Sequence, residues 1–222
     1  MRLIFVRHGE PNYDLDCLTE LGHKQAKIAA KRLMNEGIEK IFSSPLGRAY
    51  QTAQAFSEAS GLKQIEIVDF MKEIRYGLED ALYIDDKYNP WEIANQAMGE
   101  GVNLQDPNLE AFPDFQENTA TIDVKKMMAE SDKWLETLGY KREGLYYRNI
   151  CKNDEKHTYA LFCHGGSSTA FLSRVLNIPF PHLCALLHFP FTGITTLRFD
   201  RNPGSLAAPA LEIVSDGRHL IQ

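Results

Sequence analysis

Short runs of consecutive apolar residues alternate along the chain with longer segments of helical spacing. Residues 3–6 and 159–163 form two strand-like apolar runs, and residues 40–42 form a third strand-like segment. An unbroken apolar run is typical of a strand that is buried on both faces, as in a parallel sheet covered by helices. The pattern therefore predicts buried strands at these three places.

Three segments with apolar residues at helical spacing follow these runs. Residues 19–36 begin at the capping residue Thr19 and stop at Gly37, and residues 45–60 place Pro45 in the first turn and stop at Gly61. A third helix is predicted over 168–176. Near the end of the chain, the β-branched segment 193–199 and residues 211–214 read as strands separated by a turn at 201–205. The predicted fold class is α/β, a three-layer α/β/α sandwich with a mostly parallel central sheet.

The alternation of strand and helix fails between about residues 77 and 150. This stretch is rich in aromatic and charged residues, and its part from 121 to 138 has helical spacing. The acidic residues between Asp80 and Asp86 read as a solvated face. We predict one domain over residues 1–222 with a helical cap inserted at about 77–150. Such a cap would exclude water and supply contacts that distinguish substrates.

Polar residues follow each of the first three strand-like runs. Arg7 and His8 come directly after the first run, and Gly9 permits a sharp exit from the strand. His164 follows the run at 159–163, and Arg48 lies near the start of the helix after the run at 40–42. Ligands of open α/β sheets bind outside the carboxyl ends of the strands, so these cations and imidazoles are expected to converge on one anion.

These residues belong to four motifs that occur in a characteristic order. They are Arg7-His8-Gly9-Glu10, Leu18-Thr19-Glu20-Leu21-Gly22, the segment from Ser43 through Arg48 to Ala53, and His164-Gly165-Gly166. In this order the motifs resemble the histidine phosphatase superfamily, which includes the cofactor-dependent phosphoglycerate mutases. The resemblance covers about residues 1–76 and 157–199.

The resemblance implies a phosphoryl-transfer mechanism. His8 would attack phosphorus and form a phosphohistidine, while His164 and the guanidinium groups of Arg7 and Arg48 stabilise the phosphoryl charge. An acid must protonate the leaving alkoxide and later deprotonate water. The segment 72–77 resembles the family segment that supplies this acid and aligns Glu73 with it. Glu10, directly after the turn, is interpreted as structural.

One position departs from the family pattern. Asp14 stands where the family often has an asparagine that contacts phosphate, and a carboxylate there would repel a dianion. Either Asp14 points away and Asn12 takes the role, or the site is tuned for another substrate or has weakened activity. Phosphate binding is assigned to Arg7, Arg48, Asn12 and Gly165.

The preferred function is hydrolysis of a small phosphorylated substrate through a phosphohistidine on His8. A phosphoglycerate mutase is the alternative. Mutases of this family usually extend the first motif with a Trp-Asn pair, whereas Pro11, Asn12 and Tyr13 follow Glu10 here. A third reading is a phospholigand-binding protein that has lost turnover on the same fold.

The composition limits the kind of protein and the partners that the chain can have. With 222 residues and 44% hydrophobic content the chain can bury a full core, and its net charge of −6 disfavours nucleic acid as a partner. The N-terminus enters the first strand without a leader, and no run approaches the roughly 18 apolar residues of a spanning helix, so a cytoplasmic location without membrane contact is expected.

The four cysteines are widely spaced and expected to be reduced. We predict no metal and no cofactor. The remaining histidines are expected to be structural or solvated, although His188 precedes a segment that runs beside the site in the family.

Overall fold

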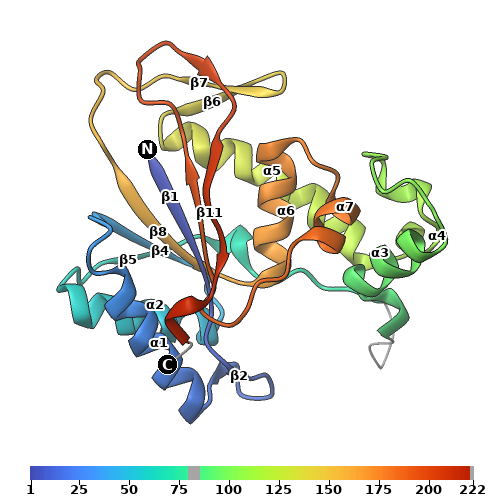
Figure 1. Cartoon of the computed structure of the whole chain (residues 1–222), viewed down its shortest axis with the longest axis horizontal. Coiled ribbons are helices and arrows are strands. Elements are labelled where there is room, and N and C mark those ends of the chain that lie inside the picture. Colours follow the sequence, from blue (N-terminus) through green and yellow to red (C-terminus); the bar gives the residue numbers. More distant parts are fainter. Residues whose placement is uncertain (80–85, 221–222) are drawn as a thin grey trace.

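The computed structural model describes residues 1–79 and 86–220, and its centre is a six-stranded sheet (Figure 1). The strand order is β11-β9-β1-β8-β4-β5. The strands β1, β8, β4 and β5 run parallel, β9 runs antiparallel to β1, and the edge strand β11 pairs antiparallel with β9 and so runs in the direction of β1. The predicted mixed α/β fold with a mostly parallel sheet is confirmed. The strand bounds are β1 Arg2–Arg7, β4 Lys40–Ser43, β5 Ile65–Ile67, β8 Thr158–Cys163, β9 Ile194–Arg198 and β11 Ala210–Asp216.

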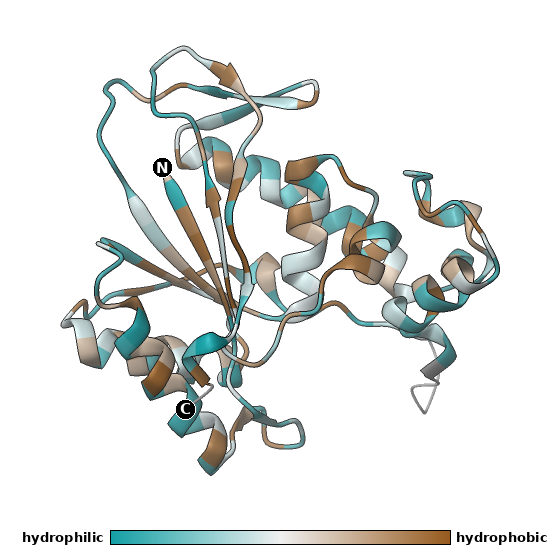
Figure 2. Ribbon diagram, in the orientation of Figure 1, coloured by the Kyte–Doolittle hydropathy of each residue, from teal (hydrophilic) through white to brown (hydrophobic). Residues whose placement is uncertain are grey.

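Alternate residues of the central strands enter two separate cores. Leu3 and Phe5 of β1 pack in one core, and Ile4 and Val6 pack in the other. Successive side chains of a strand point to opposite faces, so an unbroken apolar run is what a sheet covered on both sides requires. Figure 2 shows the hydrophobic residues concentrated along these central strands.

Helices cover both faces of the sheet. Helices α1 (Glu20–Leu33) and α2 (Gly47–Ser60) lie on one face, and α5 (Thr119–Thr137) and α6 (Gly165–Leu176) lie on the other (Figure 1). Thr19 caps α1 as predicted, since its hydroxyl accepts a hydrogen bond from the backbone N–H of Gly22 at 3.0 Å. Helix α2 begins two residues after Pro45, and α6 begins three residues earlier than predicted. The earlier start of α6 places its N-terminus directly after His164.

The segment between β5 and β8 holds most of the structure that the sequence pattern left open. Its helices are α3 (Pro90–Gly99), α4 (Pro113–Gln116) and α5, with the short 3-10 turns η1 (Asp69–Met71), η2 (Asp86–Tyr88) and η3 (Leu109–Ala111). Figure 1 shows α3 and α4 on the side of α6 away from the sheet, and α3 packs against α7 (Phe180–Leu186). The acidic stretch interpreted as a solvated face lies outside the described residues, apart from Asp86.

The end of this segment differs from the helical expectation. Strands β6 (Tyr140–Glu143) and β7 (Tyr146–Asn149) form a hairpin that pairs with β10 (Leu206–Ala207). Gly144 adopts a φ of +60° in the hairpin turn, a conformation that glycine reaches without steric cost. Tyrosine favours strands, and the tyrosine-rich sequence around the turn fits this outcome.

The remaining elements are short. They are the ribbon of β2 (Pro11–Asn12) and β3 (Cys17–Leu18), and the 3-10 turn η4 (Arg218–Leu220). All four cysteines are free thiols. In the part of the chain that the structure describes, none of the helices has the length and apolar character needed to cross a membrane.

Candidate active site

The pairing of β1 with β8 brings two histidines together at the carboxyl end of the sheet. Arg7 is the register partner of Cys163, so His8 and His164 each follow the last paired residue of their strand. The backbone N–H of His8 donates to the carbonyl of Cys163 at 2.9 Å, and the centroids of the two imidazole rings lie 5.1 Å apart. Both side chains are buried, with exposed fractions of 1% and 0%.

A backbone carbonyl fixes the tautomer of His8. The Nδ1 atom of His8 lies 2.7 Å from the carbonyl oxygen of Gly9. A carbonyl only accepts hydrogen bonds, so Nδ1 carries the proton and Nε2 keeps its lone pair. Burial lowers the pKa of His8 to about 3; the charges of Arg7 and Arg48 act in the same direction, against the bond to Gly9. The imidazole is therefore neutral near pH 7, as a nitrogen nucleophile must be.

Ser44 orients the second histidine. Its Oγ atom lies 2.8 Å from Nε2 of His164 and accepts the backbone N–H of Leu46 at 3.3 Å. When the serine hydroxyl donates its proton to Nε2, the proton of the neutral imidazole is on Nδ1. Burial, together with the charges of His8, Arg48 and Arg7, holds the pKa of His164 well below its usual value. In this tautomer, neutral His164 has an Nδ1–H that it can donate to a ligand.

Two arginines complete the cationic side of the site. Arg7 donates through Nη1 to the carbonyl of Phe189, and its guanidinium lies 4.4 Å from the centroid of the Phe191 ring. Arg48 projects from the first turn of α2 and is only 8% exposed. Asp16 binds it, with Arg48 Nη1 2.6 Å from Oδ1.

Three buried polar atoms around this site have no hydrogen-bond partner among the described residues. They are Nε of Arg7, Nε of Arg48 and Nδ1 of His164. Unpaired buried donors are costly, and native proteins rarely keep them without a ligand, ion or water to accept them. Charged nitrogens and an imidazole of this kind suit the oxygens of a phosphoryl group.

Glu73 reaches the site from the loop after η1. Its Oε1 atom accepts the backbone N–H of Ile74 and of Ser167, each at 3.0 Å, and also interacts with that of Gly166. The last two belong to the first turn of α6, where free N–H groups and the helix dipole favour a negative charge. Burial raises the pKa of Glu73 in spite of these bonds, which lower it. A carboxyl group with a raised pKa is suited to carry a proton to a leaving oxygen.

The approach of Glu73 to α6 depends on Gly166. A Cβ atom at this position would come within 2.6 Å of Oε1 of Glu73 and 2.5 Å of Cγ1 of Ile74. Neither contact is sterically possible without movement of the Glu73 loop. The second glycine of the His164-Gly165-Gly166 motif is thus needed for space. The first, Gly165, lines the cavity beside Arg7.

The polar residues of the first loop differ in their contacts. Glu10 accepts the hydroxyl of Thr19 at 2.9 Å and tethers the loop to α1. Asn12 accepts the backbone N–H of Leu15 at 3.2 Å, and Asp14 is exposed. Neither Asn12 nor Asp14 is among the described residues that line the cavity, whereas Tyr13 between them is.

Sequence reasoning missed three residues of the site: Tyr13, Asp16 and Ser44. The Tyr13 ring lies 5.4 Å from the Arg48 guanidinium, and its hydroxyl interacts with Arg7, so it contacts both cations. Asp16 also accepts the backbone N–H of Gly47 at 2.6 Å. Ser44 offered a signal, since it follows a buried strand at the carboxyl edge of the sheet. The contacts of Tyr13 and Asp16 depend on the path of the loop, and no sequence spacing indicates that path.

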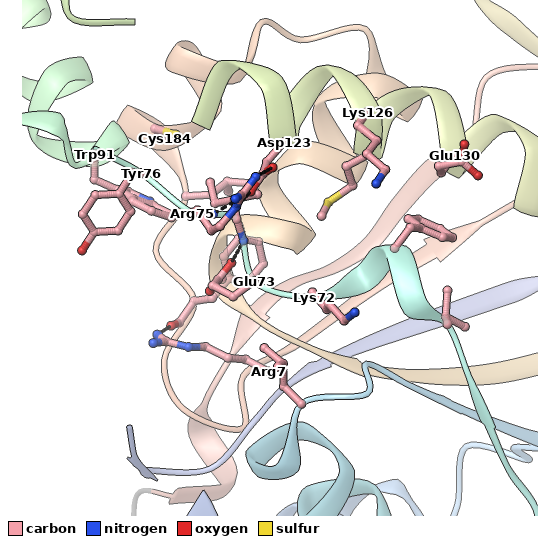
Figure 3. Close-up of a pocket in the computed structure, with 18 of the residues that line it drawn as sticks. Arg7, Lys72, Glu73, Arg75, Tyr76, Trp91, Asp123, Lys126, Glu130 and Cys184 are labelled. Carbon is pink, nitrogen blue, oxygen red and sulfur yellow. Dashed lines mark hydrogen bonds and ion pairs between the residues drawn. The ribbon is translucent and has the colours of Figure 1, made fainter. Parts of the chain in front are cut away.

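A cavity of about 1710 Å³ opens from this site toward the segment between β5 and β8. Arg7, Arg48 and Glu73 line one part of it, and residues of α3 and α5 line another. Figure 3 shows Arg7 and Glu73 among the lining residues, together with Arg75 and its partner Asp123. His188 also lines the cavity. Within the described ranges, no three His, Cys, Asp or Glu side chains are grouped to hold a metal ion.

Comparison with known families agrees with the geometry. Residues 3–132 match the model of the histidine phosphatase superfamily, branch 1. The chain belongs to the histidine phosphatase superfamily. The match covers β1, β4 and the segments that carry Arg7, His8, Arg48 and Glu73.

Among curated members of the histidine phosphatase superfamily, the matches are local. The chain is 37% identical over 95 residues to phosphoserine phosphatase 1 of Hydrogenobacter thermophilus, a match that covers 39% of this chain and 44% of that protein. It is 38% identical over 74 residues to the probable phosphoglycerate mutase GpmB of Yersinia pestis, covering 29% of this chain and 34% of that protein. The matches thus span less than half of either relative.

Solved structures match over nearly the whole chain. A phosphoserine phosphatase from Entamoeba histolytica, solved in complex with 3-phosphoglyceric acid, superposes with a TM-score of 0.66 at 24% identity, covering 99% of this chain and 98% of that chain. A mycobacterial glucosyl-3-phosphoglycerate phosphatase gives a TM-score of 0.65 at 22% identity, covering 96% and 98%. At these identities the likeness shows a shared fold.

Proposed function

We propose that this protein is a phosphomonoesterase that hydrolyses a small phosphorylated substrate through a phosphohistidine on His8. The observation that carries the proposal is the hydrogen bond from Nδ1 of His8 to the carbonyl of Gly9. This bond leaves the lone pair of Nε2 available in a neutral imidazole beside two guanidinium groups. The names of the structural neighbours, together with that of one curated relative, favour the same reaction class.

The proposed reaction has two steps. In the first, Nε2 of His8 attacks phosphorus, the bond from phosphorus to the alcohol oxygen breaks, and protonated Glu73 gives its proton to that oxygen. In the second, Glu73 takes a proton from water, the water oxygen attacks phosphorus, and the bond from phosphorus to Nε2 breaks to release phosphate. Arg7, Arg48 and His164 hold the phosphoryl oxygens in both steps.

Other features of the proposal follow from this mechanism. Arg7 and Arg48 supply the positive charge, so the reaction as proposed uses no metal ion and no cofactor. We propose a cytoplasmic enzyme in which residues 1–222 act as one domain and the segment from about 77 to 150 caps the site. The amide oxygen of Asn12 accepts the N–H of Leu15, which leaves its amide N–H groups to donate to a phosphoryl oxygen, so Asn12 stays a proposed phosphate ligand. Tyr13 is proposed beside it, because it lines the cavity.

Phosphoglycerate mutase activity is the second candidate, since several curated relatives from Yersinia are named probable phosphoglycerate mutases. Incubation with 3-phosphoglycerate, with and without 2,3-bisphosphoglycerate as primer, distinguishes the two. The proposal predicts release of inorganic phosphate from monoesters and little 2-phosphoglycerate. Primer-dependent formation of 2-phosphoglycerate would establish the mutase instead.

Trapping of the intermediate tests the hydrolase directly. Wild-type protein is mixed with a phosphate ester, quenched, and analysed by mass spectrometry for an acid-labile, base-stable phosphoryl group on His8. We expect this group in the wild type and neither label nor turnover in His8→Ala. Turnover that survives in His8→Ala contradicts the nucleophile. Vanadate binding without turnover of any ester would indicate a binding protein.

A further inference from the structure

The cavity beside the phosphate site is larger than a small phosphate ester requires. Its volume is about 1710 Å³, whereas sites for drug-sized ligands are roughly 300–1,000 Å³. Arg7, Arg48 and Glu73 occupy only one part of its wall. A phosphoryl group with a short alcohol would fill that part and leave the rest empty.

Aromatic rings form much of the remaining wall. The chain has two tryptophans, Trp91 and Trp134, and both line the cavity, as do Tyr76 and Phe70. Trp134 is fixed against the core, with its ring 5.1 Å from that of Phe42 in an edge-to-face arrangement. Trp91 is the second residue of α3, and the side chain of Asn89 accepts its backbone N–H at 3.0 Å. Both tryptophans are half-buried and line the cavity.

The cations along the same wall already have acidic neighbours. Lys72 pairs with Asp69 at 2.9 Å, and Lys133 pairs with Glu130 at 2.8 Å. Arg75 binds Asp123 at 2.8 Å (Figure 3), and Lys126 lies close enough to help keep the carboxyl of Asp123 ionised. Each of these cations already has an acidic side chain close by that partly neutralises it, so a substrate carboxylate would gain less from it than from a cation without an acidic neighbour.

We propose that the alcohol part of the substrate carries an uncharged, flat ring that packs against Trp91, and has no carboxylate beside the phosphate. This inference rests on the proposed phosphatase function and names the class of substrate. The size of the cavity favours a bulky group, its indole and phenol rings favour apolar flat surfaces, and the acidic side chains beside the cations named above reduce their attraction for an acid. The phosphoserine and 3-phosphoglycerate named for the structural neighbours would be poor substrates of this chain.

Two alkyl esters with similar leaving groups test the proposal. 2-(4-Nitrophenyl)ethyl phosphate carries a ring, ethyl phosphate does not, and both release a primary alcohol. Their kcat/KM values are measured beside those of phosphoserine and 3-phosphoglycerate for wild type, Trp91→Ala and Trp91→Phe. Tyr146→Ala is the matched control, because Tyr146 is an exposed aromatic residue on β7 that does not line the cavity.

We expect the wild type to prefer the ring ester over ethyl phosphate by about tenfold in kcat/KM, the order of one aromatic contact. Trp91→Ala should remove most of this preference and leave ethyl phosphate within about twofold, while Trp91→Phe and Tyr146→Ala should retain it. A preference for phosphoserine or 3-phosphoglycerate, or an equal loss of both alkyl esters in Trp91→Ala, overturns the inference.

A binding measurement separates this inference from the proposed function. Both tryptophans line the cavity, so bound 2-(4-nitrophenyl)ethanol should quench the tryptophan fluorescence of the wild type in a saturable manner, and less so in Trp91→Phe. Absence of saturable quenching overturns the ring site. Saturable quenching in a protein that hydrolyses no ester overturns the phosphatase and retains the ring site.

Discussion

Asp16 Oδ1 lies 2.6 Å from Nη1 of Arg48, and the other carboxylate oxygen of Asp16 accepts the backbone N–H of Gly47. One carboxylate therefore holds both the side chain of Arg48 and the start of α2, the helix that carries it. Asp16 adopts a φ of +46°, and a Cβ on Gly47 would meet its carbonyl oxygen at 2.0 Å. The ion pair is thus part of a tight contact between the first loop and α2.

Removal of this carboxylate should release Arg48. In Asp16→Ala, we expect kcat/KM for ethyl phosphate to fall about 10- to 100-fold, since small misplacements of a positioning group have effects of this order. Vanadate should bind more weakly in parallel. Asp14→Ala is the control, since Asp14 is exposed and should leave both values near wild type. Tighter vanadate binding in Asp16→Ala would mean that charge repulsion outweighs positioning.

The role of Glu73 should depend on the leaving group. In Glu73→Gln, hydrolysis of ethyl phosphate should fall by about 10²- to 10⁴-fold, the usual contribution of a general acid. 4-Nitrophenyl phosphate should lose much less in its first step, because nitrophenolate leaves without a proton. Burst kinetics with this ester then report slow hydrolysis of the intermediate. Equal loss of the first step for both esters would assign Glu73 a structural role.

Substitution of Gly166 should impair proton transfer from Glu73 to the leaving group, although Glu73 itself is still present. A methyl group in Gly166→Ala would overlap Oε1 of Glu73, so we expect the leaving-group dependence of Glu73→Gln to reappear in weaker form. Gly99→Ala in α3 is the control, since a Cβ there has no heavy atom of the described structure within 4 Å. Unchanged kinetics in Gly166→Ala would show that the loop carrying Glu73 adapts freely.

Burial of neutral His8 should make folding stability depend on pH. Its pKa is lowered to about 3 in the folded protein, against about 6.5 in an unfolded chain. Between these values the unfolded state binds a proton that the folded state does not, so stability falls as the pH falls below 6.5. The stability that neutral His8 contributes is fully present above pH 6.5. Lowering the pH from 7 to 5 reduces the free energy of unfolding by about 2 kcal/mol through this residue.

Urea denaturation at pH 7 and pH 5 measures this dependence. We expect the difference in unfolding free energy between the two pH values to be about 2 kcal/mol smaller in His8→Gln than in the wild type. The comparison concerns only the pH dependence, so a constant loss of stability in the variant does not affect it. Equal pH dependence in both proteins would show that His8 titrates normally when folded.

The sheet was predictable from sequence where burial alone determines the pattern. The runs that became β1 and β8 are apolar at nearly every position because helices cover both faces. The placement of Arg7, His8 and His164 at their ends followed from the same pattern. Strand β5 was missed, since its three residues, Ile65–Ile67, form too short a segment to show a period.

The contacts that complete the site were harder to predict from the sequence. Glu73 was assigned by resemblance, but its hydrogen bond to Ser167 joins residues 94 positions apart and depends on where α6 begins. Asp16 and Asp14 both lie in the first loop and are chemically identical. Only the turn with positive φ at Asp16 decides which of them faces Arg48.

The register of β1 against β8 sets the spacing of the two histidines. Each follows the last residue of a paired strand, so their separation is inherited from the distance between neighbouring strands, about 4.8 Å. That distance belongs to the backbone ladder and is unaffected by substitutions in the segment between β5 and β8. Evolution or design can therefore rebuild the walls contributed by α3 and α5 for new molecules while the reactive centre keeps its dimensions.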